Sequence, residues 1–128
     1  MFFSTNKQKG NTALGVAIAY FTSNNYTVSI PLNDTQDYDL IVEKDGILEI
    51  VQVKSSGCKN KAGNYQVALK SCGGTKGNTY KTFINTKVDL LFIFLEDHSI
   101  YLIPRADSSN TSTITITSKY SKYKRTLF

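Results

Sequence analysis

The first part of the chain carries apolar residues at helical spacing. Leu14, Ile18 and Phe21 follow one another at intervals of four and three residues, with alanines and a tyrosine beside them. This period predicts an amphipathic helix over residues 6–23. The Asn24-Asn25 pair is expected to end the helix, because asparagine tolerates the left-handed backbone conformation.

Beyond residue 25 the pattern changes to short apolar runs between turn residues, which predicts strands. The expected strands cover residues 26–30, 39–43, 47–55, 65–69, 88–95, 100–103 and 114–116. An Asp45-Gly46 turn is expected to join the second and third strands into a hairpin. The run 88–95, which is apolar except for Asp89, predicts a buried central strand. Residues 71–85 are expected to form a loop and residues 118–128 a short basic helix. This order predicts an α+β domain with a restriction-endonuclease-like plan, in which a mixed sheet carries the N-terminal helix on one face.

The length of 128 residues suits one domain that spans residues 1–128. Hydrophobic residues make up 41% and charged residues 20%, as in soluble globular proteins. The apolar runs are too short to cross a membrane, and the first residues lack the pattern of a signal peptide. Two cysteines without a secretion signal favour a reduced, cytoplasmic setting.

Basic residues gather in two stretches of the chain that contain no acid. Residues 51–88 carry seven lysines, and residues 108–128 carry three lysines and one arginine. The remaining stretches, 1–50 and 89–107, are both net acidic, and the total charge is +5. Basic blocks of this kind favour a polyanionic partner, with nucleic acid as the first candidate. A solvated lysine-rich surface is the alternative that charge alone leaves open.

One segment combines a carboxylate with polar residues on a strand. Asp39 lies at the start of one hairpin strand, and the partner strand ends in Gln52-Val53-Lys54. Because strand side chains alternate, Gln52 and Lys54 share one face, and hairpin pairing is expected to bring Asp39 opposite them. Mg²⁺ prefers oxygen ligands. The Asp39 carboxylate, the Gln52 amide and the Val53 carbonyl are therefore candidate metal ligands for phosphodiester cleavage.

Lys54 completes this candidate site, where its ammonium would position the attacking water or stabilise the developing negative charge. Ordinary structural roles are open for the same residues. Asp39 is also typical of a residue that caps a turn at a strand start. Lys54 could instead mark the position where the strand reaches solvent.

The pattern resembles the PD-(D/E)xK nuclease superfamily, and within it the small homing endonucleases encoded by group I introns, which have a Gln in place of the second acid. The resemblance is carried by Lys9-Gly10 and by residues 25–31, 38–42, 51–54, 88–92 and 100–104. It implies Mg²⁺-dependent cleavage of double-stranded DNA by a homo-oligomer, a dimer or a tetramer. It also implies that Asp39, Gln52 and Lys54 are the catalytic residues.

One position departs from the pattern of this family. The family usually has a Glu on the first helix, four residues after the Gly, where this chain has Leu14. Four interpretations are open: a shifted helix alignment, a site with fewer ligands, substitution by Asp37 or Glu49, or loss of cleavage. The expected function is a site-specific homing-type DNA endonuclease. The alternatives are an inactive nuclease-fold DNA-binding protein and a structure-selective nuclease similar to Holliday-junction resolvases.

The expected DNA contacts are lysines at the start of the helix and in the loops that follow the candidate site. They are Lys9, Lys59, Lys61, Lys70, Lys76 and Lys81. The Gly-rich stretch 73–77 lacks the spacing of a nucleotide-binding loop, so no nucleotide cofactor is expected. In the C-terminal basic block, Tyr120 and Tyr123 alternate with lysines. These tyrosines either contact nucleic acid or pack on the sheet while the lysines are solvated.

Overall fold

The computed structural model describes residues 5–33, 37–69, 71–72, 80–81, 87–108 and 112–128. Its first element is helix α1 (Asn6–Ser23), with the bounds that the apolar period predicts. The Thr5 hydroxyl accepts a hydrogen bond from the backbone N–H of Gln8 at 3.1 Å and so caps the first turn. Asn25 has a φ of 68° just after the last turn, so the asparagine pair ends the helix as expected. Among the described residues, none of the helices has the length and apolar character that a membrane crossing needs.

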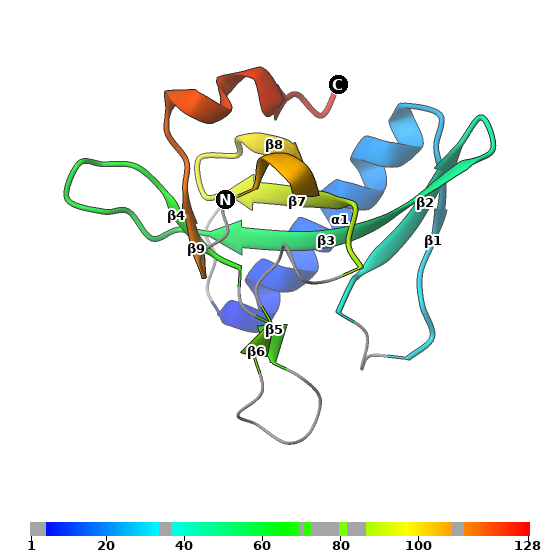
Figure 1. The fold of residues 1–128 in the computed structure, drawn as a ribbon, viewed down its shortest axis with the longest axis horizontal. Helices are drawn as coiled ribbons and strands as arrows, with labels where there is room; N and C mark the ends of the chain where they lie inside the picture. The colour runs from blue at the N-terminus through cyan, green and yellow to red at the C-terminus, as the bar shows by residue number, and fades with distance from the viewer. Residues whose placement is uncertain (1–4, 34–36, 70, 73–79, 82–86, 109–111) are drawn as a thin grey trace.

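Six strands form one mixed sheet in the order β1-β2-β3-β7-β8-β10 (Figure 1). They are β1 (Thr27–Ser29), β2 (Leu40–Lys44), β3 (Ile47–Ser56), β7 (Leu90–Leu95), β8 (Ile100–Pro104) and β10 (Lys124–Arg125). The β2–β3 hairpin turns through Asp45 and Gly46, which both have a positive φ, as the sequence predicts. All neighbouring pairs are antiparallel except β3 and β7. Every residue of β7 is buried, as its apolar run predicts.

Both faces of this sheet are covered. On one face, Ala13, Ala17, Tyr20 and Phe21 of α1 form a hydrophobic core with residues of β2, β3 and β7. The small alanine side chains allow the helix to lie close to the sheet. The opposite face is covered by the paired strands β4 (Gln66–Ala68) and β9 (Thr113–Thr115), together with the 3-10 helix η4 (Ser118–Tyr123). The sequence predicts the helical layer but not this second one.

Two expectations about local structure hold only in part. The short basic helix expected over residues 118–128 is the 3-10 helix η4, which ends at Tyr123 and is followed by β10, paired with the edge of β8. The two tyrosines of η4 are three residues apart, a spacing that places both side chains on one side of a 3-10 helix. Within the expected loop 71–85, the described residues form two short paired strands, β5 (Ser71–Cys72) and β6 (Tyr80–Lys81), and the rest of this stretch lies outside the described residues. A 3-10 turn, η3 (Arg105–Asp107), follows β8 and has no counterpart among the predicted elements.

Candidate active site

The candidate site lies where β2 stops and β3 continues. The last residue pair of β2 and β3 at this end is Leu40 with Val51, whereas β3 extends to Ser56. Along this extension β3 stays paired with β7 on one edge. In the described part of the chain, no strand takes the place of β2 on the other edge. The N–H and the carbonyl of one strand residue point to the same side. Because the N–H of Val53 is directed to this open edge, the Val53 carbonyl is directed there as well.

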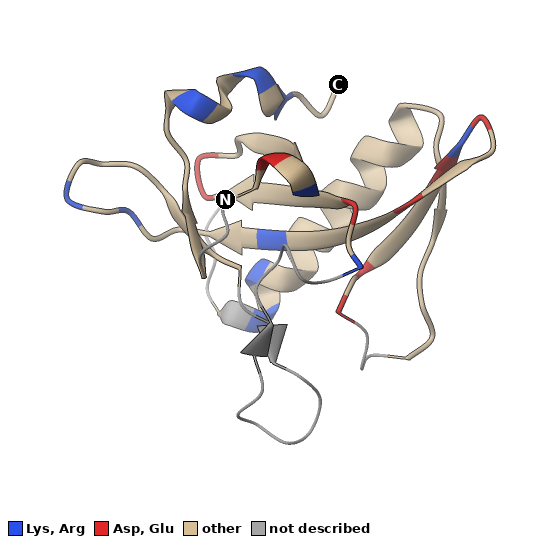
Figure 2. Ribbon diagram, in the orientation of Figure 1, with Lys and Arg blue, Asp and Glu red and all other residues tan. Residues whose placement is uncertain are grey.

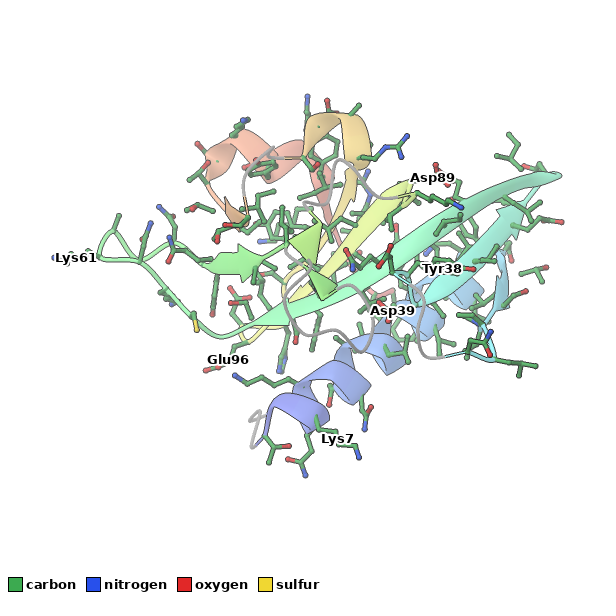
Figure 3. The ribbon with its side chains drawn as sticks, turned by 60° about the horizontal axis from the view of Figure 1, so that its bottom comes forward. Lys7, Tyr38, Asp39, Lys61, Asp89 and Glu96 are labelled. Atoms are coloured by element: carbon green, nitrogen blue, oxygen red, sulfur yellow. The ribbon has the colours of Figure 1, made fainter. Side chains whose placement is uncertain are left out.

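Asp39 occupies the beginning of the open edge, immediately before β2 (Figure 3). Its backbone N–H donates to the Val51 carbonyl at 2.9 Å, and its carboxylate oxygen Oδ2 accepts a hydrogen bond from the N–H of Val53 at 2.7 Å. The side chain thus takes the place of the next strand carbonyl and is held firmly. Burial raises the pKa of the Asp39 carboxyl, against the lowering effects of this hydrogen bond and of the Lys54 charge.

Gln52 is the most deeply buried polar residue beside Asp39. Its side chain is only 5% exposed, and the pairing of Leu40 with Val51 places Asp39 opposite Gln52 on the same face. The Gln52 amide Nε2 donates to the backbone carbonyl of Asp37 at 2.9 Å. The amide oxygen Oε1 is buried and has no hydrogen-bond partner among the described residues. An unsatisfied buried oxygen is costly and marks a position where a ligand fits.

Lys54 lies two residues further along β3, on the same face as Gln52. Burial lowers the pKa of its ammonium, and the neighbouring Asp39 charge opposes this shift. The charges of Asp39 and Lys54 therefore influence one another's pKa. The structure therefore brings together the side chains of Asp39, Gln52 and Lys54, as the alternation along the strand predicts, and the backbone carbonyl of Val53 is directed to the same open edge. It also shows that Asp39 has the structural role of a cap in addition.

Helix α1 contributes no carboxylate to this site. Residues 1–33 contain neither Asp nor Glu, so no shift of the alignment places an acid on the helix. Leu14 is half-buried against the core between α1 and the sheet. Glu49 pairs with Val42 and, by alternation, lies on the face opposite Gln52. Of the two substitutes that the sequence leaves open, only Asp37 lies next to Gln52, through its backbone carbonyl.

A hollow of about 430 Å³ adjoins the open edge of β3. Three sides of the hollow come from α1, from the end of β3 and from β4. The residues that matter for its chemistry are Lys9, Gly10, Val53, Lys54, Cys58 and Gln66. Lys9 and Lys54 contribute ammonium groups to the lining, which suit a phosphate group, and the Glu96 carboxylate lies against Gly57 in the same lining.

Of the other predicted DNA contacts, the structure describes the side chains of two, and neither lines the hollow. Lys59 and Lys61 are exposed in the loop between β3 and β4, with Lys61 at its far tip (Figure 3). Figure 2 shows basic residues at the start of α1, in β3 and along this loop, and acidic residues in the β2–β3 hairpin, at the starts of β2 and β7, in the β7–β8 turn and on η3. Lys81 belongs to β6, but its side chain is outside the described part. Lys70 and Lys76 lie outside the described residues.

In the C-terminal basic block, the tyrosines pack on the sheet, which is one of the two roles expected from the sequence. Tyr120 is buried in the core on the face opposite α1, and Tyr123 is partly buried against it. Lys119 and Lys122 are exposed, with their ammonium groups 5.4 Å and 5.1 Å from the ring centroids of these tyrosines. The tyrosines thus serve the core, and the lysines are solvated.

Sequence reasoning missed a second aspartate that holds β3. The Asp89 carboxylate accepts a hydrogen bond from the N–H of Ile50 at 2.8 Å, and the Asp89 N–H donates to the Ile50 carbonyl at 2.8 Å. Asp39 and Asp89 therefore fix opposite edges of the same strand. A signal was present in the sequence, since each aspartate directly precedes the apolar run of a strand that neighbours β3.

The sequence matches the PD-(D/E)XK endonuclease family over residues 4–126. Among solved structures, the fold is similar to that of a bacterial homing endonuclease, I-Ssp6803I, with a TM-score of 0.77 and 25% sequence identity. This similarity covers 94% of the present chain and 89% of the other chain. Comparison with curated proteins gives no match. The restriction-endonuclease-like α+β fold expected from the sequence is confirmed. Because the family match spans nearly all of its residues, the chain belongs to the PD-(D/E)XK endonuclease family.

Proposed function

We propose that this protein is a homing-type DNA endonuclease that hydrolyses phosphodiester bonds at specific sites with Mg²⁺. The observation that carries the proposal is the buried amide oxygen of Gln52, which has no hydrogen-bond partner in the described part of the chain and lies on the same face as the Asp39 carboxylate and Lys54. Membership of an endonuclease family and similarity to a homing endonuclease support the class of reaction.

The oxygen atoms at the open edge of β3 suit a hard divalent cation. Asp39 would contribute a carboxylate, Gln52 its amide oxygen and Val53 its backbone carbonyl, and Mg²⁺ prefers such ligands. Among the described residues, no three His, Cys, Asp or Glu side chains gather at one place. The site would therefore depend on neutral oxygens more than most metal sites do. When bound, Mg²⁺ polarises the scissile phosphate and makes a water more acidic.

The residues of the chain itself have separate tasks in this proposal. Asp39 is held by the Val53 N–H, so its carboxylate needs little reorganisation to accept a cation. Burial penalises the negative charge of Asp39, and a neighbouring cation relieves that penalty. Lys54 would hold the attacking water or stabilise the charge that develops on the phosphate. The hollow lined by Lys9 and Lys54 would receive the phosphate group.

The proposed substrate is double-stranded DNA, and the proposed active form is a homo-oligomer, a dimer or a tetramer. One small domain contacts only a few base pairs, so a long recognition site requires at least two subunits. Two copies of the site described above would also provide one active centre for each DNA strand.

A second candidate function is a DNA-binding protein that has the fold but does not cleave. It is favoured by the absence of any acid from residues 1–33, which leaves Leu14 at the position of the usual helix Glu. In this alternative, Lys9, Lys59 and Lys61 bind phosphates, and the binding weakens as salt rises.

A cleavage assay on a pool of linear duplexes with random sequence tests these functions. The pool is incubated with Mg²⁺, and the new ends are sequenced for the wild type, Lys54→Met and Lys122→Met. Lys122 is the matched control, because it is an exposed lysine on η4 outside the hollow. We expect cuts at a defined sequence, lost in Lys54→Met and retained in Lys122→Met.

Other outcomes of this assay point to the alternatives. Salt-sensitive binding without cuts in Mg²⁺ or Mn²⁺ would contradict the endonuclease proposal and support the inactive DNA-binding protein. Cuts only in added four-way junctions would replace the homing-type substrate by a branched one. Equal cutting by the wild type and Lys54→Met would remove Lys54 from the reaction.

A further inference from the structure

The segment between β3 and β4 is a two-stranded ribbon that extends from the hollow. We define it as residues 57–66. The backbone N–H of Gln66 donates to the Cys58 carbonyl at 2.9 Å, Lys59 and Tyr65 pair as a β-bridge, and the N–H of Asn60 donates to the Asn64 carbonyl at 2.9 Å. This ladder makes the 57–66 ribbon an ordered element.

The base of the ribbon is fixed to the sheet. The buried Ser56 hydroxyl donates to the Gln66 carbonyl at 2.5 Å and accepts a hydrogen bond from the Cys58 N–H at 3.1 Å. On the other strand, the N–H of Ile116 donates to the Tyr65 carbonyl at 2.8 Å. A recognition element anchored in this way loses little conformational entropy when it binds.

The two faces of the ribbon differ in chemistry. Lys59 and Tyr65 share one face, where the tyrosine packs against the core and the Lys59 ammonium lies 4.8 Å from its ring centroid. Because strand side chains alternate, Cys58, Gln66, Asn60 and Asn64 share the other face. Cys58 and Gln66 line the hollow. The amide-rich face of the ribbon therefore continues directly from the wall of the hollow.

The shape of the ribbon suits the major groove of DNA, which is about 12 Å wide and admits a two-stranded β-ribbon. From Cys58 to Lys61 the ribbon extends by about 10 Å, or about three base pairs at roughly 3.4 Å per pair. Small residues, Ala62 and Gly63, form the turn beside Lys61 and permit close approach to bases. Asn and Gln side chains are suited to the N6 and N7 atoms of adenine.

We propose that the 57–66 ribbon enters the major groove beside the scissile phosphate, where Asn64 and Gln66 read base edges within about three base pairs of the cut. The Asn60 side chain stabilises the turn instead, since its Oδ1 accepts the N–H of Asn64 at 3.0 Å. Lys61 at the tip contacts phosphate. The inference rests on the proposed DNA substrate but not on catalytic competence, because base reading does not require cleavage.

The test measures DNA binding without divalent metal, by selection from a duplex library of random sequence. The variants are Asn64→Ala, Gln66→Ala and Lys61→Ala, with Lys122→Ala as the control on η4 and thermal unfolding as the check of folding. We expect Asn64→Ala and Gln66→Ala each to lose base preference at one or two positions, by roughly 5- to 150-fold. We expect Lys61→Ala to weaken binding to all sequences equally and to reduce the salt dependence by about one counterion.

An adenine analogue without the N7 acceptor identifies the groove. Placed at the position read by Asn64, it should weaken binding of the wild type and leave binding of Asn64→Ala unchanged. The inference is overturned if folded Asn64→Ala and Gln66→Ala keep every base preference, or if they only weaken binding uniformly. It is also overturned if the analogue weakens the wild type and the variant equally. Binding with these effects but without cleavage would refute the endonuclease alone, whereas no DNA binding would refute both proposals.

Discussion

Replacing Gln52 by leucine separates the structural cost of the site from its function. The Gln52 Oε1 atom is buried without a partner among the described residues, and such an acceptor costs about 1–3 kcal/mol. Leucine has a similar volume and removes this oxygen. The change also removes the hydrogen bond from Nε2 to the Asp37 carbonyl, measured at 2.9 Å and worth about 1 kcal/mol. The free energy of unfolding should therefore stay unchanged or rise by up to about 2 kcal/mol.

The assay is thermal unfolding of the wild type and of Gln52→Leu, first in EDTA and then in Mg²⁺. In EDTA, each kcal/mol should appear as roughly 3 to 5 °C in Tm for a domain of this size. At a Mg²⁺ concentration ten times the dissociation constant, binding should stabilise the wild type by about 1.4 kcal/mol. Gln52→Leu should gain much less, and its DNA cleavage should be lost. A protein that becomes more stable while it loses activity identifies the oxygen as a functional group.

Gln8→Leu is the matched control, because Gln8 is exposed in the first turn of α1. A surface change of this kind should alter the free energy of unfolding by no more than about 0.5 kcal/mol and leave the Mg²⁺ response intact. The reasoning is refuted if Gln52→Leu is clearly less stable than the wild type in EDTA. It is refuted equally if Mg²⁺ raises the Tm of Gln52→Leu and of the wild type by the same amount.

Three further substitutions test the charges of the site. The Asp39 carboxyl has a raised pKa in the folded protein, so its protonation stabilises the fold. This contribution is present below the ordinary carboxyl pKa of 3.8 and is lost as pH rises through the higher folded pKa. Urea unfolding in EDTA across this pH range should show the loss of stability for the wild type and not for Asp39→Asn. Lys54→Met removes an ammonium whose pKa is lowered by burial, so unfolding should show little loss of stability, while single-turnover kinetics should show at least about 100-fold slower cleavage. Gln52→Glu should bind Mg²⁺ more tightly, as measured by calorimetry, and an unchanged affinity would contradict the ligand role of this position. The same variant should have a lower Tm in EDTA, because its carboxylate faces the Asp37 carbonyl.

The parts of the fold that the sequence predicts are those with local signals. α1 has its apolar period and its asparagine pair, the β2–β3 hairpin has Asp45-Gly46, and β7 is apolar throughout. The C-terminal segment has no such signal. Its strand β10 exists because the exposed edge of β8 offers backbone partners, and only the tertiary structure creates that edge. The same holds for β4 and β9, which pair across a long separation in sequence.

In the candidate site, too, local sequence patterns predict some features, and others depend on the tertiary structure. Alternation along β3 is enough to place Gln52 and Lys54 on one face and to bring Asp39 opposite. The sequence does not show that Gln52 is buried or that its amide donates to the Asp37 carbonyl. Both facts depend on tertiary contacts, which no local pattern in the sequence indicates. The double role of Asp39, as a cap for the Val53 N–H and as a candidate ligand, is likewise visible only in three dimensions.

The most direct test of the account is to map where a metal ion binds on the polypeptide. Fe²⁺ bound in place of Mg²⁺ gives one electron to added hydrogen peroxide, which yields hydroxide and a hydroxyl radical, and added ascorbate returns the iron to Fe²⁺. The radicals cut the nearby backbone, and mass spectrometry locates the cuts. We predict cuts next to Asp39 and within Gln52-Val53-Lys54, suppressed by excess Mg²⁺ and absent from Asp39→Asn. Cuts centred on Glu49 or Asp89, or an unchanged pattern in Asp39→Asn, would contradict the proposed site.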